Sequence, residues 1–243
     1  KNNVGIGEYK QGADWQKNRR AFCDDRFKLN VLFPVNLQSP QLYKHAPFDV
    51  CESTLDHTFF KTWDSIKHNV ILHWVDLVEK KNKYGLALLS DHTTSYSYGD
   101  DSPLGLTAQY SGIGLWGWDY RITQPLHLKY ALVPHREKWD KAGIATEINK
   151  WNEPLIAAYY TDVTMQNKSW INTEDTGYEV SAVNLQDGSM LIRLFNADGD
   201  DSPQKVRLGF LASGTEMTVS MPRFGLRTFL FKRNSVNEFN IIQ

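Results

Sequence analysis

The sequence predicts an all-β protein: antiparallel β-sandwiches, a large one followed by a smaller C-terminal one, with one short connecting helix. Two observations lead to this fold class. Apolar and polar residues alternate with period two in several separate segments, which is typical of half-buried antiparallel strands. Short clusters of Gly, Asp, Ser and Pro stand between these segments, where tight turns are expected.

The predicted strands follow in chain order. In the first, Phe27, Leu29, Val31 and Phe33 alternate with their neighbours until Pro34 ends the run. The run from 69 to 75 is apolar and β-branched, which predicts one strand, and Tyr84 to Leu89 predicts a short buried one. The remaining alternating runs are Leu126–Leu132, Tyr178–Ala182, Met190–Leu194 and Leu226–Leu230.

Three segments have the composition of turns. They are Gly99–Pro103, Gln186–Ser189 and Asp198–Pro203. The second contains Asp187-Gly188, the strongest hairpin signal, because Gly tolerates the positive φ that a two-residue turn requires.

One segment has helical spacing. Between Arg136 and Trp151, Ile144, Ile148 and Trp151 are separated by four and three residues, and Pro154 follows soon after. This predicts a single amphipathic helix that connects two strands.

A polar stretch near Thr164 to Thr176 predicts a linker or long loop. We therefore expect a large β-sandwich domain over residues 1–165 and a smaller β-sandwich region over residues 174–243.

The composition excludes several classes of function. The 243 residues include 27 Lys and Arg against 28 Asp and Glu, a formal net charge of −1, so nothing favours nucleic acid or an anionic membrane as a partner. No apolar run approaches the ~20 residues that cross a bilayer. Two cysteines, Cys23 and Cys51, cannot form a disulfide framework. Because the chain starts at Lys1 without an apolar leader, we expect it to be processed or cut from a longer protein.

Motifs for catalysis are missing from the sequence. The seven histidines form neither a His-x-x-x-His nor a His-x-Asp pattern, so no metal site is expected. Asp91 and His92 are adjacent, and on a strand they would point to opposite faces and not cooperate. The acids at 100–101 and 198–201 lie in turn sequences, where Asp binds its own backbone. The glycines of 112–117 do not open a helix, which argues against a dinucleotide site.

One segment has the composition of a carbohydrate site. Aromatic faces stack on the C–H surfaces of sugars, while Asp and Arg bind hydroxyl groups. Packing of these rings in the interior is the alternative. The candidate residues are Trp116, Trp118, Asp119, Tyr120 and Arg121.

Several segments resemble a known family. The sequence Gly85-Leu86-Ala87-Leu88-Leu89-Ser90-Asp91 is followed by Tyr130-Ala131-Leu132-Val133-Pro134-His135 and then Asn152-Glu153-Pro154-Leu155. The flanks are Arg26 to Pro34, Leu191 to Asn196 and Phe224 to Thr228. The order and spacing of these six segments resemble the C-terminal β-rich region of the family 38 glycoside hydrolases, the zinc-dependent α-mannosidases. In the order in which the segments are given above, the corresponding family patterns are G-V-A-L-L-N-D, Y-A-L-x-P-H, N-x-P-L, R-x-x-L-x-V-x-F-P, L-x-L-R-L-Y-N and F-x-I-R-T.

The chain departs from that family at two points. Ser90 stands where an Asn is common, and the stretch from Leu104 to Tyr110 lacks the Arg that many members carry. The missing Arg puts a ligand contact from that strand in doubt.

The resemblance implies a non-catalytic fragment. In the family, an N-terminal β/α domain binds zinc through a His-x-Asp pair, another Asp and a distant His, and an Asp attacks the sugar. This chain has no His-x-Asp pair and is too short to include that domain. We therefore expect no catalytic residue, metal site or cofactor in this chain, and zinc in the missing domain. The parent would hydrolyse terminal α-linked mannose with retention, while this chain alone would be inactive and would support and partly wall the active site.

The implied partners are the N-terminal catalytic and helical domains of the same parent chain, and mannose-containing glycans. A free-standing carbohydrate-binding module is the alternative, suggested by eight Trp and eleven Tyr. A structural or adhesion sandwich without a ligand is a third. If the chain is a fragment, we expect an exposed apolar surface where it contacted its missing neighbour.

Overall fold

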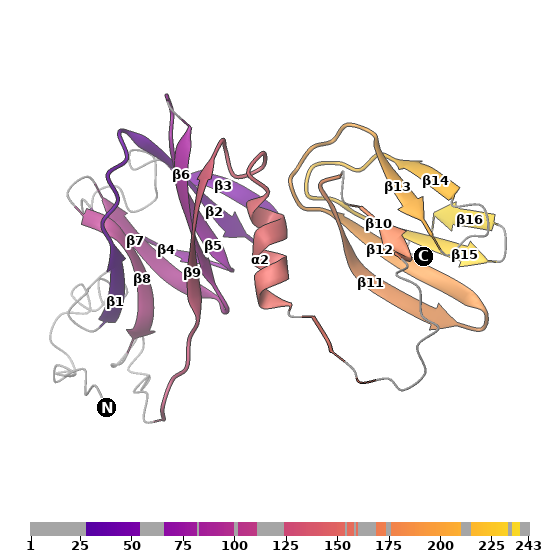
Figure 1. Cartoon of the computed structure of the whole chain (residues 1–243), viewed down its shortest axis with the longest axis horizontal. Coiled ribbons are helices and arrows are strands. Elements are labelled where there is room, and N and C mark those ends of the chain that lie inside the picture. Colours follow the sequence, from indigo (N-terminus) through magenta and orange to yellow (C-terminus); the bar gives the residue numbers. More distant parts are fainter. Residues whose placement is uncertain are drawn as a thin grey trace, which may run out of the picture. The chain divides into compact units, whose positions relative to one another are not determined.

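A computed structural model shows a chain of antiparallel sheets with a single helix in its described part (Figure 1). The chain divides into two compact units, residues 1–144 and 145–243. The structure describes residues 28–53, 66–81, 83–99, 102–110, 124–153, 155–157, 159, 169–173, 176–209, 215–232 and 235–238.

The first unit contains two sheets. One has the strand order β1-β8-β7-β4 and the other β3-β2-β5-β6-β9, with every pairing antiparallel. The strands are β1 (Lys28–Phe33), β2 (Pro40–Ala46), β3 (Asp49–Ser53), β4 (Ile66–Ile71), β5 (Trp74–Glu79), β6 (Tyr84–Ser90), β7 (Thr94–Gly99), β8 (Ser102–Tyr110) and β9 (Tyr130–Arg136).

The core of this unit lies between the two sheets. Alternate residues of both sheets point into it, as the period-two pattern requires. Its buried members are Leu42, Ile71, Val75, Leu77, Leu88, Tyr96, Leu104 and Leu106. The two sheets therefore form the sandwich that the sequence predicts.

The five-stranded sheet is also covered on its other face. Trp74, on β5, is 1% exposed, and its ring lies 5.6 Å from that of Trp139, which follows β9. All six residues of β5 are buried. The strand has no solvent-exposed face because protein covers both of its sides.

The second unit contains two smaller sheets. Their strand orders are β10-β13-β14 and β11-β12-β15-β16, again antiparallel. The strands are β10 (Ile171–Asn172), β11 (Tyr178–Gln186), β12 (Ser189–Asn196), β13 (Gln204–Leu208), β14 (Thr215–Val219), β15 (Leu226–Lys232) and β16 (Ser235–Glu238). A separate core fills this unit, formed by Tyr178, Ile192, Leu194, Val206, Leu208, Val219, Met221, Phe229 and Phe231.

The predicted hairpin at Asp187-Gly188 is present. Gln186 pairs with Ser189, and both turn residues have positive φ, 51° at Asp187 and 71° at Gly188. These are the backbone angles of a type I′ turn, whose twist matches that of the two strands it joins.

Asn196 fixes the turns that follow β12. Its side chain is fully buried, and its Nδ2 donates to the backbone oxygens of Asp200 at 2.8 Å and Pro222 at 3.1 Å. Its Oδ1 accepts a hydrogen bond from the Gly199 backbone N–H at 3.1 Å. One side chain thus joins the 196–203 turn to the segment before β15.

The predicted fold class is confirmed: the chain is mainly β, its four sheets are antiparallel, and a single helix, α2 (Ile144–Asn152), lies in the described part. Ile144 and Ile148 are buried, as their spacing predicts. The turn interpretation of the 198–201 acids is also confirmed, because the Asp200 and Ser202 N–H groups donate to the carboxylates of Asp198 and Asp200.

Three details of the predicted elements are wrong. The run Leu126–Leu132 is a strand only from Tyr130, where β9 begins, because residues 124–129 lie outside any strand. The run 69–75 is not one strand, because a turn at Leu72 and His73 separates β4 from β5. Ile71 and Trp74, on either side of the turn, are both buried, so no exposed residue of either strand marks the break. In the polar segment expected to be a linker, Ile171 and Asn172 form β10 and pair with Leu208 and Arg207.

No helix in the described residues is long and apolar enough to span a membrane.

Candidate functional site

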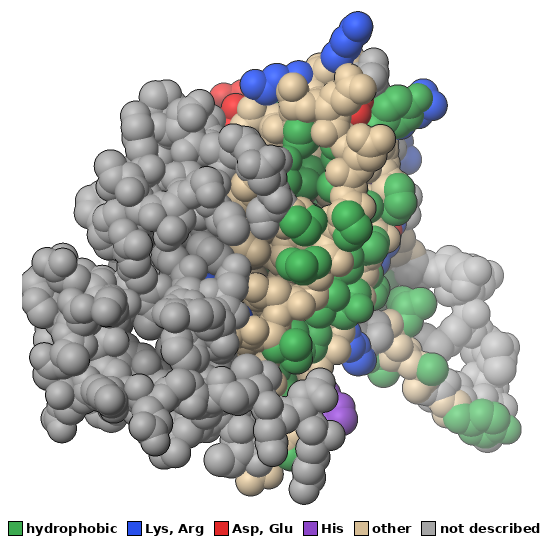
Figure 2. Space-filling model, turned by 90° about the vertical axis from the view of Figure 1, so that its left-hand side faces the viewer, with side chains coloured by type: hydrophobic (Ala, Val, Ile, Leu, Met, Phe, Trp, Pro, Cys, Tyr) green, Lys and Arg blue, Asp and Glu red, His purple; other side chains and the backbone are tan. Residues whose placement is uncertain are grey.

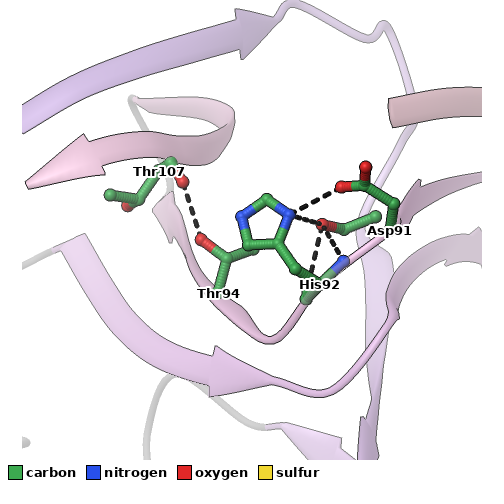
Figure 3. Close-up of polar contacts among 5 residues, drawn as sticks. Asp91, His92, Thr94 and Thr107 are labelled. Carbon is green, nitrogen blue, oxygen red and sulfur yellow. Dashed lines mark hydrogen bonds and ion pairs between the residues drawn. The ribbon is translucent and has the colours of Figure 1, made fainter. Parts of the chain in front are cut away.

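The most accessible acid–base pair of the described first unit lies in the turn between β6 and β7 (Figure 3). Asp91 Oδ1 is 2.7 Å from His92 Nδ1, and the two side chains are 30% and 39% exposed. The sequence-based expectation that these neighbours would not cooperate is wrong. They lie beyond the end of β6, in a turn where adjacent side chains are free to converge.

Four hydrogen bonds hold this turn and the start of β7. The Ser90 N–H donates to the His73 carbonyl at 2.7 Å, and the Asp91 N–H donates to the Lys129 carbonyl at 3.2 Å. The Ser90 hydroxyl, fully buried, donates to the His92 carbonyl at 2.9 Å. Thr94, the first residue of β7, donates through Oγ1 to the Thr107 carbonyl on β8 at 2.6 Å.

The pair has a defined electrostatic state. Slight burial raises the pKa of Asp91, but the hydrogen bond from His92 and that from the Lys129 backbone outweigh it, so the pKa lies below its ordinary value. An ionised Asp91 accepts a hydrogen bond from His92 Nδ1, so Nε2 is the ring nitrogen that does not contact Asp91. Among the described residues, Nε2 has no hydrogen-bond partner.

This arrangement differs from a serine-hydrolase triad. Ser90 Oγ is 3.4 Å from His92 Nδ1, the same nitrogen that contacts Asp91. In a triad the serine lies at the other ring nitrogen, which removes its proton. The turn therefore presents a carboxylate and an imidazole acceptor to hydroxyl groups, without an activated nucleophile.

A second pair, Asp76 and His135, is buried inside the five-stranded sheet. Asp76 is on β5 and His135 on β9, and their Oδ1 and Nε2 atoms are 2.8 Å apart although β6 lies between the two strands. Gly85 of β6 pairs with His135, and a Cβ at this glycine would collide with the imidazole ring. The missing side chain allows the ring to cross β6 and reach Asp76.

The two groups of this pair influence each other's ionisation. Burial raises the pKa of Asp76, and the His135 hydrogen bond only partly opposes this. Burial alone would lower the pKa of His135, but the hydrogen bond and charge of Asp76 raise it above the ordinary value. Since the side chains are 0% and 6% exposed, the pair cannot meet a substrate, and we assign it a structural role.

Another histidine of this sheet, His45, is partly buried. The ring of His45 is stacked on Trp74 at 5.8 Å and lies 5.8 Å from the ring of His73. Burial, with a smaller effect of His73, lowers the pKa of His45 to about 4. His45 is therefore neutral at physiological pH.

The aromatic segment predicted to contact sugar lies outside the described residues. This applies to Trp116, Trp118, Asp119, Tyr120 and Arg121.

No group of three or more His, Cys, Asp or Glu in the described part of the chain could hold a metal ion. Sequence reasoning missed the Asp76–His135 pair, and Gly85 opposite His135 was the only signal for it.

Comparisons with known proteins show the fold. No protein-family model and no curated protein matches the sequence. Two solved structures from Enterococcus faecalis are similar: a protein in the glycosyl hydrolase family 38 (TM-score 0.63, 17% identity) and an alpha-mannosidase (TM-score 0.66, 16% identity). Each match covers 84% of this chain but only 26% of the other chain. The fold is thus that of one part of these much longer chains.

Proposed function

We propose that this chain is the non-catalytic β-sandwich portion of a zinc-dependent, retaining α-mannosidase that hydrolyses terminal α-linked mannose. The observation that carries the proposal is the unequal coverage of the structural match, 84% of this chain against 26% of the two similar structures. Sequence segments that resemble family 38 also follow in the expected order along the chain. A part of a larger enzyme accounts for both findings.

In the parent enzyme, this chain supports the catalytic domain and forms part of the active-site wall. The Asp91–His92 turn is the described feature best suited to that wall. A carboxylate and an imidazole Nε2 both accept hydrogen bonds, and the hydroxyl groups of mannose donate them. Because the backbone of the turn is fixed by Ser90 and Lys129, the two acceptors are preorganised.

Zinc belongs to the missing domain in this proposal. A catalytic zinc site requires three converging protein ligands and an open position. The described residues do not fit this requirement, because no group of three or more His, Cys, Asp or Glu among them could hold a metal ion. No step of the reaction is assigned to a metal on this chain.

The decisive experiment compares the complete open reading frame with the 243-residue chain. We expect the complete protein to hydrolyse an aryl α-mannoside, to lose activity with a chelator and to regain it with zinc, whereas the shorter chain shows no turnover. The anomer of the first product, followed by NMR, reports retention. Turnover by the 243-residue chain, or a reading frame without a hydrolase domain, would refute the proposal.

The role of the turn is tested by substitution in the complete protein. Asp91→Ala and His92→Ala should each raise KM several-fold with a smaller effect on kcat, because they remove binding contacts rather than reacting groups. His127→Ala is the matched control, an exposed histidine on the segment before β9. If His92→Ala and His127→Ala have the same KM, the Asp91–His92 turn does not contact the substrate.

A further inference from the structure

The described part of the first unit has an open apolar edge. Among the described strands, β1 is the last of one sheet and β9 the last of the other, and the rings of Phe33 and Tyr130 are in edge contact at 5.5 Å. The two sheets thus end on the same side of the sandwich. The β1/β9 seam is formed by Leu29, Val31 and Phe33 of β1 and Tyr130, Leu132 and Pro134 of β9.

Side chains of this seam are exposed to an unusual degree for large apolar groups. Leu29 is 37% exposed, and Tyr130 and Leu132 are each 43% exposed. Figure 2 faces the side of the first unit on which β1 lies in Figure 1, and it shows hydrophobic side chains gathered in a continuous band. A contiguous apolar band on a soluble domain marks an interaction surface.

Another edge strand of the same sandwich, β3, carries exposed charges where the β1/β9 seam is apolar. β3, at the opposite end of the five-stranded sheet, presents the exposed acids Asp49 and Glu52. Charged side chains are the usual protection of a sheet edge against unwanted contacts. On β9 the exposed positions are apolar until Arg136, so this edge lacks that protection.

The structural matches connect this exposure to a longer parent protein. The similar structures have most of their length outside the matched region, which covers 26% of each. A parent of this kind has enough chain to cover the seam.

We infer that the β1/β9 seam is the surface on which another domain of the same parent chain docks, through an apolar contact centred on Tyr130 and Leu132. The inference rests on the proposed function, since it requires a longer parent. It identifies the β1/β9 seam as the exposed apolar surface that is expected of a fragment. Burial of these side chains by a neighbouring domain would stabilise the complete protein.

The test uses the complete protein and carbene footprinting, which labels side chains in proportion to their exposure. Tyr130 and Leu132 should be labelled several-fold less than Val70, a residue of similar exposure (45%) on the edge strand β4. The variant Leu132→Lys should increase labelling of Tyr130 and lower the unfolding temperature. The matched variant Val70→Lys should change neither.

The outcomes separate this inference from the proposed function. If the complete protein hydrolyses the aryl α-mannoside but Tyr130 and Leu132 are labelled as strongly as Val70, the docking surface is refuted and the function stands. If both residues are protected in a monomer without mannosidase activity, the docking stands and the function fails. Protection that disappears on dilution, with a dimer in sedimentation, would indicate a second copy and refute docking within one chain.

Discussion

Two histidines of the first unit have pKa values shifted in opposite directions because their neighbours differ. His45 faces Trp74 and His73 and has a lowered pKa, whereas His135 faces the carboxylate of Asp76 and has a raised one. His92 lies at the surface, with Asp91 on Nδ1. Residue type alone therefore does not indicate a role: the same imidazole serves as a neutral core group, a buried hydrogen-bond partner and a candidate sugar contact.

Stability above neutral pH should depend on His135. Its native pKa is raised above the ordinary value of 6.5, so its contribution to the free energy of unfolding is complete below pH 6.5 and is lost as the pH rises through the native pKa. The pKa of Asp76 is also raised, so its contribution to the free energy of unfolding is likewise lost as the pH rises. We expect the free energy of unfolding, measured in urea, to fall as the pH rises above 6.5.

Variants assign this slope to the buried pair. Asp76→Asn removes the charge that raises the pKa of His135, so the slope should flatten. Asp91→Asn, at the exposed pair, should leave it unchanged. An equal slope in wild type and Asp76→Asn would show that the buried pair does not hold its proton more tightly than the unfolded chain.

At the scale of single elements, polar side chains fix the turns while apolar side chains fix the strands. The 196–203 turn depends on Asn196, which makes hydrogen bonds to Gly199, Asp200 and Pro222 from a fully buried position. The final Asn of the L-x-L-R-L-Y-N resemblance therefore has a physical reason. It is required by the turn, not by the strand.

Replacing Asn196 should destabilise the second unit. Asn196→Ala leaves buried carbonyl and N–H groups without partners, at a cost of about 2–3 kcal/mol in the free energy of unfolding. The control Asn184→Ala, at an exposed position of β11, should change it by less than about 0.5 kcal/mol. Urea unfolding measures both, and similar losses in the two variants would contradict the role of the Asn196 contacts.

At the scale of the whole molecule, the two units have separate cores with no residue in common. A substitution in one unit should therefore leave the amides of the other unaffected. Gly85→Ala forces a methyl group against the His135 ring and should cost about 1–3 kcal/mol. Ile192→Ala opens a cavity in the second core and should cost about 2–5 kcal/mol.

Native-state hydrogen exchange distinguishes the two effects. Gly85→Ala should speed exchange of amides in β5 and β6 and leave those of β12 and β15 unchanged. Ile192→Ala should do the reverse. Faster exchange throughout the chain in either variant would mean that the two units unfold together.

The fold class was predictable from sequence because most strands have one face toward a core. The alternation in β12 shows this directly, because Ile192 and Leu194 are buried while Arg193 between them is not. The break between β4 and β5 was not predictable, because both sides of the turn are buried and Leu72-His73 contains neither Gly nor Pro. Strands covered on both faces lose the polar positions that mark their ends.

The site was less predictable than the fold. Asp76 and His135 are 59 positions apart, and their contact depends on the register of three strands and on Gly85. Asp91 and His92 were visible as neighbours, but their contact depends on where β6 ends. Element ends are the least reliable part of sequence interpretation, so a site in a turn is easily misjudged.

The cover over β5 has a consequence for synthesis on the ribosome. Trp74 stays exposed on one side until Trp139 has been translated, because Trp139 supplies the opposing ring. When β9 has been synthesised but Trp139 has not, all described strands of the sandwich are present, yet the five-stranded sheet still lacks its outer layer. The nascent chain must therefore emerge past residue 139 before β5 is sealed, and until then chaperones find an apolar sheet surface to bind.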